Sequence, residues 1–453
     1  MTVDAHRELL TGWSRTAPTG ADLTEVDDRD DVDTLLASAG PRGLVARGLG
    51  RSYGDAAQNA GGTVIDATCL NTVRALDVER GIVRVDAGVS LDTLMRVLLP
   101  LGWFVPVTPG TRLVTVGGAL AADVHGKNHH VDGSIANHVI SFTLHTPKGV
   151  VEVTPESDPE LFWGTAGALG LTGVITEVTL RLLPVETAYI RARHTRHANL
   201  DDTMAQMADG ADADDRYTVA WIDCLATGAS LGRSVLSSGD HARLDDLPTK
   251  LHDRARQFDA RTMIGAPPWV PNGLLNRLTV AAFNEMWYRV TPSLHGHVET
   301  ISAFFHPLDG VRDWNRLYGS RGFLQYQYVV PDAATDAVRR SIEMLSAARA
   351  ASFLAVLKRF GPGNPGPLSF PAPGWTLALD IPCTVPGLAV LLDDLDELVA
   401  GVGGRVYLAK DSRLRPELLP TMYPELDRFA ELRARVDPAG VLQSDLQRRL
   451  GLP

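Results

Sequence analysis

Residues 106–130 restrict the fold more than any other part of the sequence, because a run of very small residues leads directly into a dense polar cluster. The run opens with the turn pair Pro109-Gly110 and continues through small residues at 117–122. Three histidines, a lysine and an asparagine then fall within residues 125–130. Small residues let backbone N–H groups approach a bulky anion, and a helix that begins there adds a favourable dipole. Taken alone, such a run is more often a turn packed tightly in a core, so companion segments must decide.

The first companion segment is Arg47-Gly-Leu-Gly-Arg-Ser-Tyr-Gly54, which follows a short apolar strand. Its glycines do not have the spacing of the Rossmann fingerprint, and the next element is a strand where that motif requires a helix. The segment therefore argues against a nicotinamide site, although a loop rich in N–H donors can still bind phosphate. With residues 106–130 and the bend Gly170-Leu-Thr-Gly173, it indicates one large, doubly phosphorylated ligand.

Length and composition predict a globular protein of two domains. The chain has 453 residues, 45% of them hydrophobic and 21% charged, which exceeds one ordinary core. Its net charge of −11 argues against a nucleic-acid surface. The odd number of widely spaced cysteines excludes a disulfide framework and a CxxC metal knuckle. Residues 1–11 lack the apolar core of a signal peptide and no apolar run approaches 18 residues, so we expect a cytoplasmic protein whose membrane association, if any, is peripheral.

Apolar periodicity and turn residues predict the elements of the first domain. We expect helical pieces over residues 7–36 around the turn Thr16–Gly20, strands at 43–46, 63–66, 82–86, 139–145, 150–153 and 175–182, and helices that begin at Ser90 (the N-cap) and Glu160. The composition shifts after Pro184 toward polar and Pro-rich connectors at 208–215 and 361–373, with strands at 217–224 and 323–330 and helices at 333–348 and 386–402. A strand at 405–411 and helices to Leu450 are expected to return to the first domain.

Three motifs together resemble the vanillyl-alcohol-oxidase class of FAD enzymes: Arg47–Ser52, Pro109–Thr111 with Val116–Gly118, and Leu161–Trp163 with Gly170–Glu177. Within that class, the resemblance extends over essentially the whole chain to the decaprenylphosphoryl-β-D-ribose 2′-oxidase family. The motifs that carry it are Gly48–Asp55, Asp123–His130, Gly322–Gln327, Ala409–Arg413 and Val436–Pro438. The resemblance implies an α+β fold in which residues 1–187 and 405–453 bind FAD, and residues 188–404 form a substrate domain with an antiparallel sheet.

The resemblance also implies site residues. The expected FAD contacts are Ala46, Arg47, Gly48, Leu49, Gly50, Arg51, Ser52, Tyr53, Gly54, Asp55, Ala56, Gly110, Thr115, Val116, Gly117, Gly118, Ala122, Asp123, Val124, His125, Ile175 and Tyr407. The expected catalytic set is Lys410, His125, Tyr53, Gln327, Gln325 and Lys358, the substrate pocket is Lys127, Trp221, Phe305, Phe360, Thr376 and Ala378, and no metal is expected. The remaining histidines of the motif region, His129, His130 and His138, are interpreted as structural.

The chemistry of alcohol oxidation explains why such groups are needed. A hydride leaves for the flavin, a base takes the hydroxyl proton, and cations hold a lipid-linked phosphate. Lys410 is the candidate for the hydroxyl, because burial beside a flavin can lower the pKa of a lysine. The FAD is expected to be non-covalent, since Arg51 stands where many relatives carry the linking histidine. Phe305, Thr376 and Ala378 depart from the tyrosine, asparagine and cysteine of the family pattern.

The leading hypothesis is therefore oxidation of the 2′-hydroxyl of a polyprenyl-phosphoryl ribose, the first half of an epimerisation for cell-wall arabinan. An NADH-dependent keto-reductase would complete it, quinone or O₂ would accept the electrons, and the resemblance would place the protein at the membrane or in the cell envelope. The sequence leaves two alternatives open. One is a soluble sugar, polyol or aldonolactone oxidase that uses O₂, and the other is a flavin-binding partner that holds the reductase without turnover.

Overall fold

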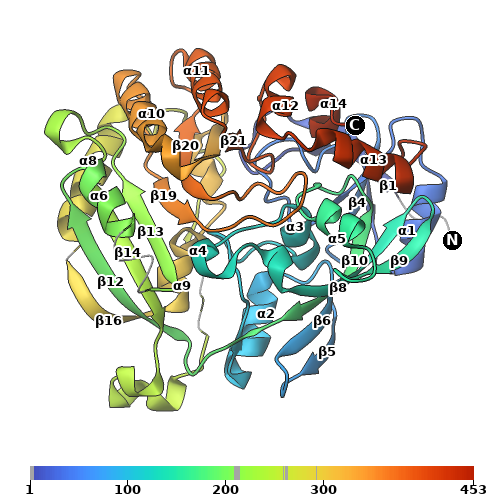
Figure 1. Cartoon of the computed structure of the whole chain (residues 1–453), viewed down its shortest axis with the longest axis horizontal. Helices are drawn as coiled ribbons and strands as arrows, with labels where there is room; N and C mark the ends of the chain where they lie inside the picture. The colour runs from blue at the N-terminus through green and yellow to red at the C-terminus, as the bar shows by residue number, and fades with distance from the viewer. Residues whose placement is uncertain (1–4, 209–214, 259, 261–263, 292) are drawn as a thin grey trace.

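The computed structural model describes residues 5–208, 215–258, 260, 264–291 and 293–453. Two sheets form its first half (Figure 1). One has the order β1 (Ala5–Leu10), β2 (Thr19–Glu25), β4 (Thr63–Asp66), β3 (Leu44–Arg47), with β2, β4 and β3 parallel. The other is antiparallel, with the order β5 (Val73–Asp77), β6 (Ile82–Asp86), β10 (Val174–Arg181), β8 (Val139–Thr146), β9 (Gly149–Val153).

An antiparallel sheet dominates the second half, and the described residues give it eight strands. Their order is β16 (Leu294–Thr300), β12 (Tyr189–His197), β14 (Ser234–His241), β13 (Tyr217–Ile222), β19 (Ala355–Phe360), β20 (Gly374–Pro382), β18 (Phe323–Val330), β21 (Arg405–Val406). Short pairs join β7 (Trp103–Phe104) to β11 (Leu183–Pro184) and β15 (Ile264–Gly265) to β17 (Val311–Arg312). The mixture of helices and largely antiparallel sheets confirms the predicted α+β class.

The helices of the first half are α1 (Arg29–Ala37), α2 (Leu91–Leu98), α3 (Val116–Ala121), α4 (His129–Asp132) and α5 (Pro159–Thr165), joined at the C-terminal end by α12 (Leu419–Met422), α13 (Leu426–Val436) and α14 (Asp445–Leu450). Those of the second half are α6 (Leu200–Gln206), α8 (Arg277–Val290), α9 (Ile301–Phe305), α10 (Thr335–Ala347) and α11 (Leu388–Gly401). No helix of the described ranges is both long and apolar enough to span a bilayer.

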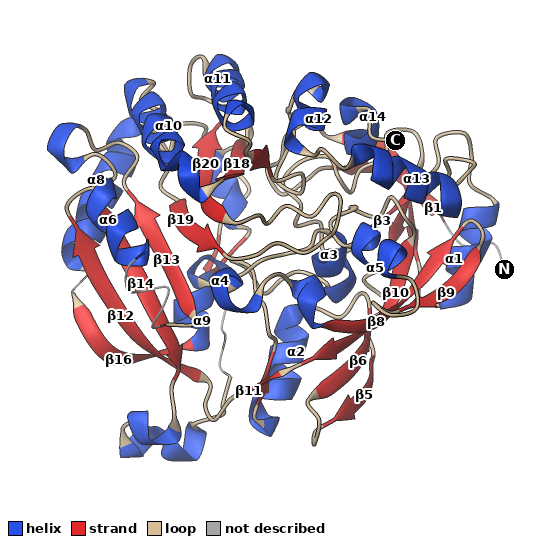
Figure 2. Ribbon diagram, viewed as in Figure 1, coloured by secondary structure: helices blue, strands red, loops and turns tan. Residues whose placement is uncertain are grey.

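Strand alternation gives the large sheet two different faces. Helices α10 and α11 pack against β18, β20 and β21 on one face (Figure 2). Tyr326 of β18 points to this side, because its hydroxyl interacts with Asp396 of α11. Side chains alternate along a strand, so Gln325 and Gln327 point to the opposite face. That face lines the cavity described below.

The termini of the described chain meet on one side of the molecule. Figure 1 shows α13 and α14 beside the N-terminal strands. Leu442 forms a β-bridge with Leu44 of β3 and shares its core cluster. Asp445 accepts hydrogen bonds from Thr19 Oγ1 and from the backbone N–H of Ala60, both 2.9 Å. The segment from Leu442 to Asp445 therefore packs against the first half.

Most predicted elements are confirmed, including β4, β6 and β18 at their predicted bounds and Ser90 as the N-cap of α2. Two predictions are wrong. Residues 7–36 contain β1 and β2 before the single helix α1. Pairing with β2 holds β1 as an edge strand, although β1 is mostly exposed. The strand expected over 405–411 ends at Val406 and pairs with β18 of the large sheet. The connector expected at 208–215 lies mostly outside the described residues.

Candidate active site

A cavity of about 510 Å³ lies between the two halves of the molecule and receives side chains from both. Of the expected FAD contacts, it is lined by Ala46, Arg47, Gly48, Leu49, Gly50, Arg51, Ser52, Tyr53, Ala56, Gly110, Thr115, Gly117, Gly118, Ala122, Val124, His125, Ile175 and Tyr407. Of the expected substrate-side residues, it is lined by Lys127, Trp221, Phe305, Gln325, Gln327, Lys358, Ala378 and Lys410. One cavity thus joins the two glycine-rich segments to the three lysines.

Six expected residues do not line the cavity, and each lies behind its wall. Asp55 pairs with Arg449 at 2.8 Å, Gly54 packs against the carbonyl of Asp411, and Val116 is buried in the core. The buried carboxylate of Asp123 accepts hydrogen bonds from Ser369 and Asn364. The remaining two are Phe360 and Thr376, which contact His125 and Gln327, respectively. These residues can support the site without touching a ligand.

The loop after β3 is held rigidly against the rest of the first half. Arg47 donates hydrogen bonds to the carbonyls of Ala57 and Thr11, at 3.0 and 2.9 Å. Gly50 has φ +63°, a conformation that favours glycine. Within the described ranges, the backbone N–H groups of residues 49–52 donate to no protein acceptor, although these residues line the cavity. Such a row of N–H donors fits the pyrophosphate of FAD.

The sequence predicts that the second glycine-rich segment, residues 106–130, offers backbone N–H donors to an anion. In the structure, the N–H groups at the start of α3 are already bonded within the protein. Thr115 is the N-cap of α3, and its Oγ1 accepts from Gly118 N–H at 3.2 Å. The N–H groups of Val116 and Gly117 donate to the carbonyls of Val89 and Ala87. The first turn of α3 therefore has no N–H group left for an anion, so the expected dipole-assisted phosphate site at this helix is wrong.

Close packing explains the small residues of both segments. A Cβ atom on Gly48 would lie 2.2 Å from Thr115 Oγ1, and one on Gly117 would lie 2.7 Å from Ala87 Cβ. The two segments touch at Gly48, where a larger side chain would separate them, and Gly117 lets α3 pack against Ala87. Together they form a narrow wall of backbone, which suits a flat ligand such as FAD.

His125 connects the two halves at the back of the cavity. Its Nδ1 lies 3.0 Å from Lys358 Nζ, and its Nε2 lies 3.0 Å from the amide of Gln327. Burial, and next the charge of Lys358, hold the pKa of His125 well below its usual range. The imidazole is therefore neutral. It satisfies both partners when Lys358 donates to Nδ1 and the Gln327 amide turns its oxygen to Nε2–H.

Lys410 lines the cavity and interacts with Asp380, which is fully buried and does not line it. Lys410 Nζ lies 3.8 Å from the centre of the Tyr53 ring. Burial lowers the pKa of Lys410, while the attraction of Asp380 opposes this shift. Burial likewise raises the pKa of Asp380, whose carboxylate accepts a hydrogen bond from Gln325. A lysine poised in this way can exchange a proton with an alcohol near neutral pH.

Sequence reasoning missed Asp380, which is fully buried on β20. The signal was present, because it is the only ionisable residue within Gly374–Pro382, a strand that is buried throughout. A buried carboxylate needs a partner, and none is close in sequence. Only folding brings partners to Asp380. These are Gln325, which pairs with it in register on β18, and Lys410.

Lys127 and Phe305 form the wall beside β16 and α9. Lys127 donates a hydrogen bond to the carbonyl of Phe304 and lies 4.2 Å from the centre of the Phe304 ring. Burial lowers the pKa of Lys127 to about 8, although the charge of Glu299 opposes this shift. Phe305 contacts Tyr217 edge-on with ring centroids 4.8 Å apart. Burial and aromatic packing hold this wall in place.

The other histidines of the motif region take positions behind the cavity, as expected of structural residues. His130 and His138 each pair with a backbone carbonyl, of Asp215 and Asp132, at 3.1 and 2.9 Å. His129 packs against the Phe360 ring, and burial lowers its pKa to about 3. None of the three lines the cavity.

Known proteins share these segments. The sequence profile of an FAD-binding domain matches residues 23–154, which include both glycine-rich segments, and that of D-arabinono-1,4-lactone oxidase matches residues 386–450. A decaprenylphosphoryl-β-D-ribose oxidase of Mycolicibacterium smegmatis is 47% identical over 98% of this chain and 97% of its own length. An uncharacterised protein of Streptomyces coelicolor is 44% identical over 80% of this chain. An L-gulono-1,4-lactone dehydrogenase of Mycobacterium tuberculosis is 24% identical over 93% of both chains.

The matched FAD-binding domain, the fold and the cavity define an FAD-dependent oxidoreductase of the vanillyl-alcohol-oxidase type. Within that class, the chain belongs to the decaprenylphosphoryl-β-D-ribose oxidase family, since the identity to the mycobacterial relative extends over nearly the full length of both chains.

Proposed function

We propose that this chain oxidises the 2′-hydroxyl of decaprenylphosphoryl-β-D-ribose, or of a similar polyprenyl-phosphoryl ribose, to the 2′-ketone. The observation that carries the proposal is the single cavity that joins the N–H donors of residues 49–52 to Lys410, Lys358 and Lys127. It holds both a place for a dinucleotide and three amino groups that can bind a sugar phosphate. The near full-length relationship to the mycobacterial oxidase supports this choice of substrate.

The residues divide the work by position. Bound FAD supplies the acceptor for the hydride of the C2′–H bond. Neutral Lys410 takes the hydroxyl proton, and Tyr53, Gln325 and Asp380 hold that lysine in place. Lys358 and Gln327, fixed through His125, orient the sugar. Lys127 attracts the phosphate, and Trp221, Phe305 and Ala378 shape the pocket.

In this proposal, residues 1–187 and 405–453 are the FAD-binding domain and residues 188–404 are the substrate domain. The keto product would pass to an NADH-dependent keto-reductase, and quinone or O₂ would reoxidise the flavin. Helix α8 exposes the apolar side chains of Leu278 and Met286, and Trp287 of the same helix lines the cavity. The exposed apolar surface therefore adjoins the cavity, which supports peripheral contact with a membrane.

The FAD is held without a covalent bond in this proposal. Arg51, at the position of the linking histidine, stacks its guanidinium 3.8 Å from the centre of the Trp13 ring, and arginine cannot form the link. Acid precipitation should release all the yellow colour into the supernatant. Colour that stays with the pellet after washing would contradict non-covalent binding.

The decisive experiment measures anaerobic bleaching of the flavin with lipid-linked ribose, free ribose, a polyol and an aldonolactone. Bleaching by the lipid-linked ribose alone is expected. The match of residues 386–450 to the lactone-oxidase profile supports a second candidate, an aldonolactone or polyol oxidase that uses O₂. Bleaching by a free lactone or polyol with release of hydrogen peroxide, and none by the lipid-linked sugar, would select it.

A further inference from the structure

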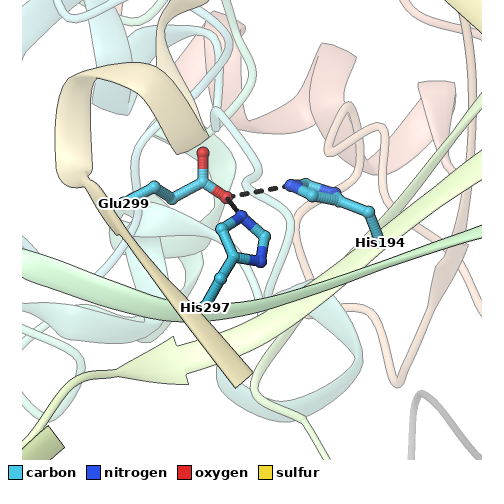
Figure 3. Close-up of side chains that lie close together, drawn as sticks. All are labelled: His194, His297 and Glu299. Atoms are coloured by element: carbon cyan, nitrogen blue, oxygen red, sulfur yellow. Dashed lines mark hydrogen bonds and ion pairs between the residues drawn. The ribbon is translucent and has the colours of Figure 1, made fainter. Parts of the chain in front are cut away.

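Three potential metal ligands converge at the cavity, which two of them, His194 and Glu299, line. His194 lies on β12, and His297 and Glu299 lie on β16, its neighbour in the sheet (Figure 3). One ligand atom from each residue lies within 4.8 Å of the other two. Glu299 Oε1 lies 3.1 Å from His194 Nε2 and 3.4 Å from His297 Nε2.

The sheet itself creates this convergence. His297 and Glu299 are two positions apart on one strand, so their side chains share a face. A shift in the pairing register between Ala192 and His194 brings His194 to the same place from β12. The ligands therefore come from rigid strands, a favourable origin for a metal site.

The separations suit a small divalent ion. Zinc binds histidine nitrogen and carboxylate oxygen at about 2.0–2.2 Å in tetrahedral geometry, which sets ligand atoms about 3.3–3.6 Å apart. The two separations to Glu299 are already near this range. Small rotations of the side chains would admit the ion between them.

The surroundings orient one of the histidines and leave the site partly open. Ser237 of β14 lies directly opposite His194, and its Oγ is 2.8 Å from Nδ1. With a metal on Nε2, the Nδ1–H of His194 would donate to that hydroxyl, as the second ligand shell of a metal site usually requires. His194, Ser237 and Glu299 also line the cavity. The charge of Lys127 also interacts with Glu299.

We propose that His194, His297 and Glu299 bind one divalent transition-metal ion, with zinc as the best match to two imidazoles and a carboxylate. Three protein ligands leave a coordination position for water or an anionic oxygen in the cavity. Binding is independent of the oxidation proposed above, because the ligands belong to β12 and β16 and the test uses the ion alone.

The test is calorimetric titration of zinc chloride into the chelator-treated, FAD-loaded protein. One equivalent should bind, and His297→Ala should weaken the affinity at least tenfold. Ser237→Ala should weaken it by about tenfold, the usual cost of a lost second-shell partner. Glu299→Gln tests the same ligand set without a large change of shape, and FAD content and the thermal midpoint confirm that each variant is folded.

His6→Ala is the matched control, because His6 also pairs with a glutamate, Glu8, but is exposed on β1. Its loss should leave the affinity unchanged. Equal affinity in wild type, His297→Ala and Glu299→Gln, or zinc binding that His6→Ala abolishes, would overturn the proposal. Absence of any binding to the wild-type protein would overturn it equally.

Discussion

Lys410 lies at the cavity wall, where burial lowers its pKa to about 7 and the attraction of Asp380 opposes this shift. Burial disfavours the charged form, so the amine becomes available as a base near neutral pH. The prediction of Lys410 from sequence rested on the motif alone. The structure adds Asp380, Gln325 and Tyr53 as the groups that hold it.

Lys410→Ala should retain FAD and lose most substrate-driven flavin reduction. A positioned base contributes about 10²–10⁴ in rate, and alanine removes it. Stopped-flow reduction measures the loss, with the exposed Lys148→Ala as the matched control. Reduction within tenfold of wild type would assign Lys410 a purely structural role.

Lys358 makes stability depend on pH. Burial, followed by the charges of Lys410 and Lys127, lowers the pKa of Lys358 to about 7. Between this value and the pKa of about 10.4 in the unfolded chain, the unfolded state binds the extra proton, so the free energy of unfolding rises with pH. Urea unfolding from pH 7 to 9 should show the rise, and Lys358→Met should reduce it. An unchanged slope in the variant would contradict a lowered pKa.

At the scale of elements, the two glycine-rich segments act as one unit. The loop after β3 offers free N–H groups, and the segment leading into α3 packs directly against it. Neither segment could form the wall alone. This division explains why each motif is weak evidence by itself.

Gly48→Ala should weaken FAD binding at least tenfold and lower the free energy of unfolding by about 1–3 kcal/mol, the usual cost of overpacking. The new Cβ would lie 2.2 Å from Thr115 Oγ1. Gly40→Ala is the control, because a Cβ there meets nothing within 4 Å. Fluorescence titration of the apoprotein with FAD measures the affinity. Equal affinities of the two variants would show that the contact is not required.

Local patterns predicted strands rich in apolar and aromatic residues, such as β6 and β18. They failed at β1, where five of six residues are exposed and only pairing with β2 holds the strand. They also failed after Val406, where the chain turns and Lys410 N–H donates to the carbonyl of Tyr407 at 2.9 Å. Most of the site residues predicted from the motifs line the cavity, whereas Asp380 and Glu299 needed the folded sheet. Pairings between distant segments have no local signature.

At the scale of the whole molecule, FAD would lie where the two halves meet. The lining of the cavity includes the loop after β3 and strands β13, β18, β19 and β20. A ligand in that position contacts both halves and stabilises their association. The halves should therefore unfold together when FAD is bound.

Addition of FAD should raise the thermal midpoint of the apoprotein in a concentration-dependent way. A ligand at one hundred times its dissociation constant adds about 2.7 kcal/mol to the free energy of unfolding. Calorimetry should show one cooperative transition for the loaded protein, with adenosine as a control that lacks the pyrophosphate. Two transitions, of which only one moves with FAD, would show that the halves are not coupled through the ligand.

Arg449 pairs with both Asp55 and Asp411, at 2.8 and 2.9 Å, so the loop beside the cavity is braced by a side chain 394 residues after Asp55. This arrangement has a consequence for the order of events during synthesis. The ribosome releases the first glycine-rich loop long before it releases its brace. We therefore expect cofactor loading to follow synthesis of Arg449, and nascent chains that stop before Arg449 to emerge colourless.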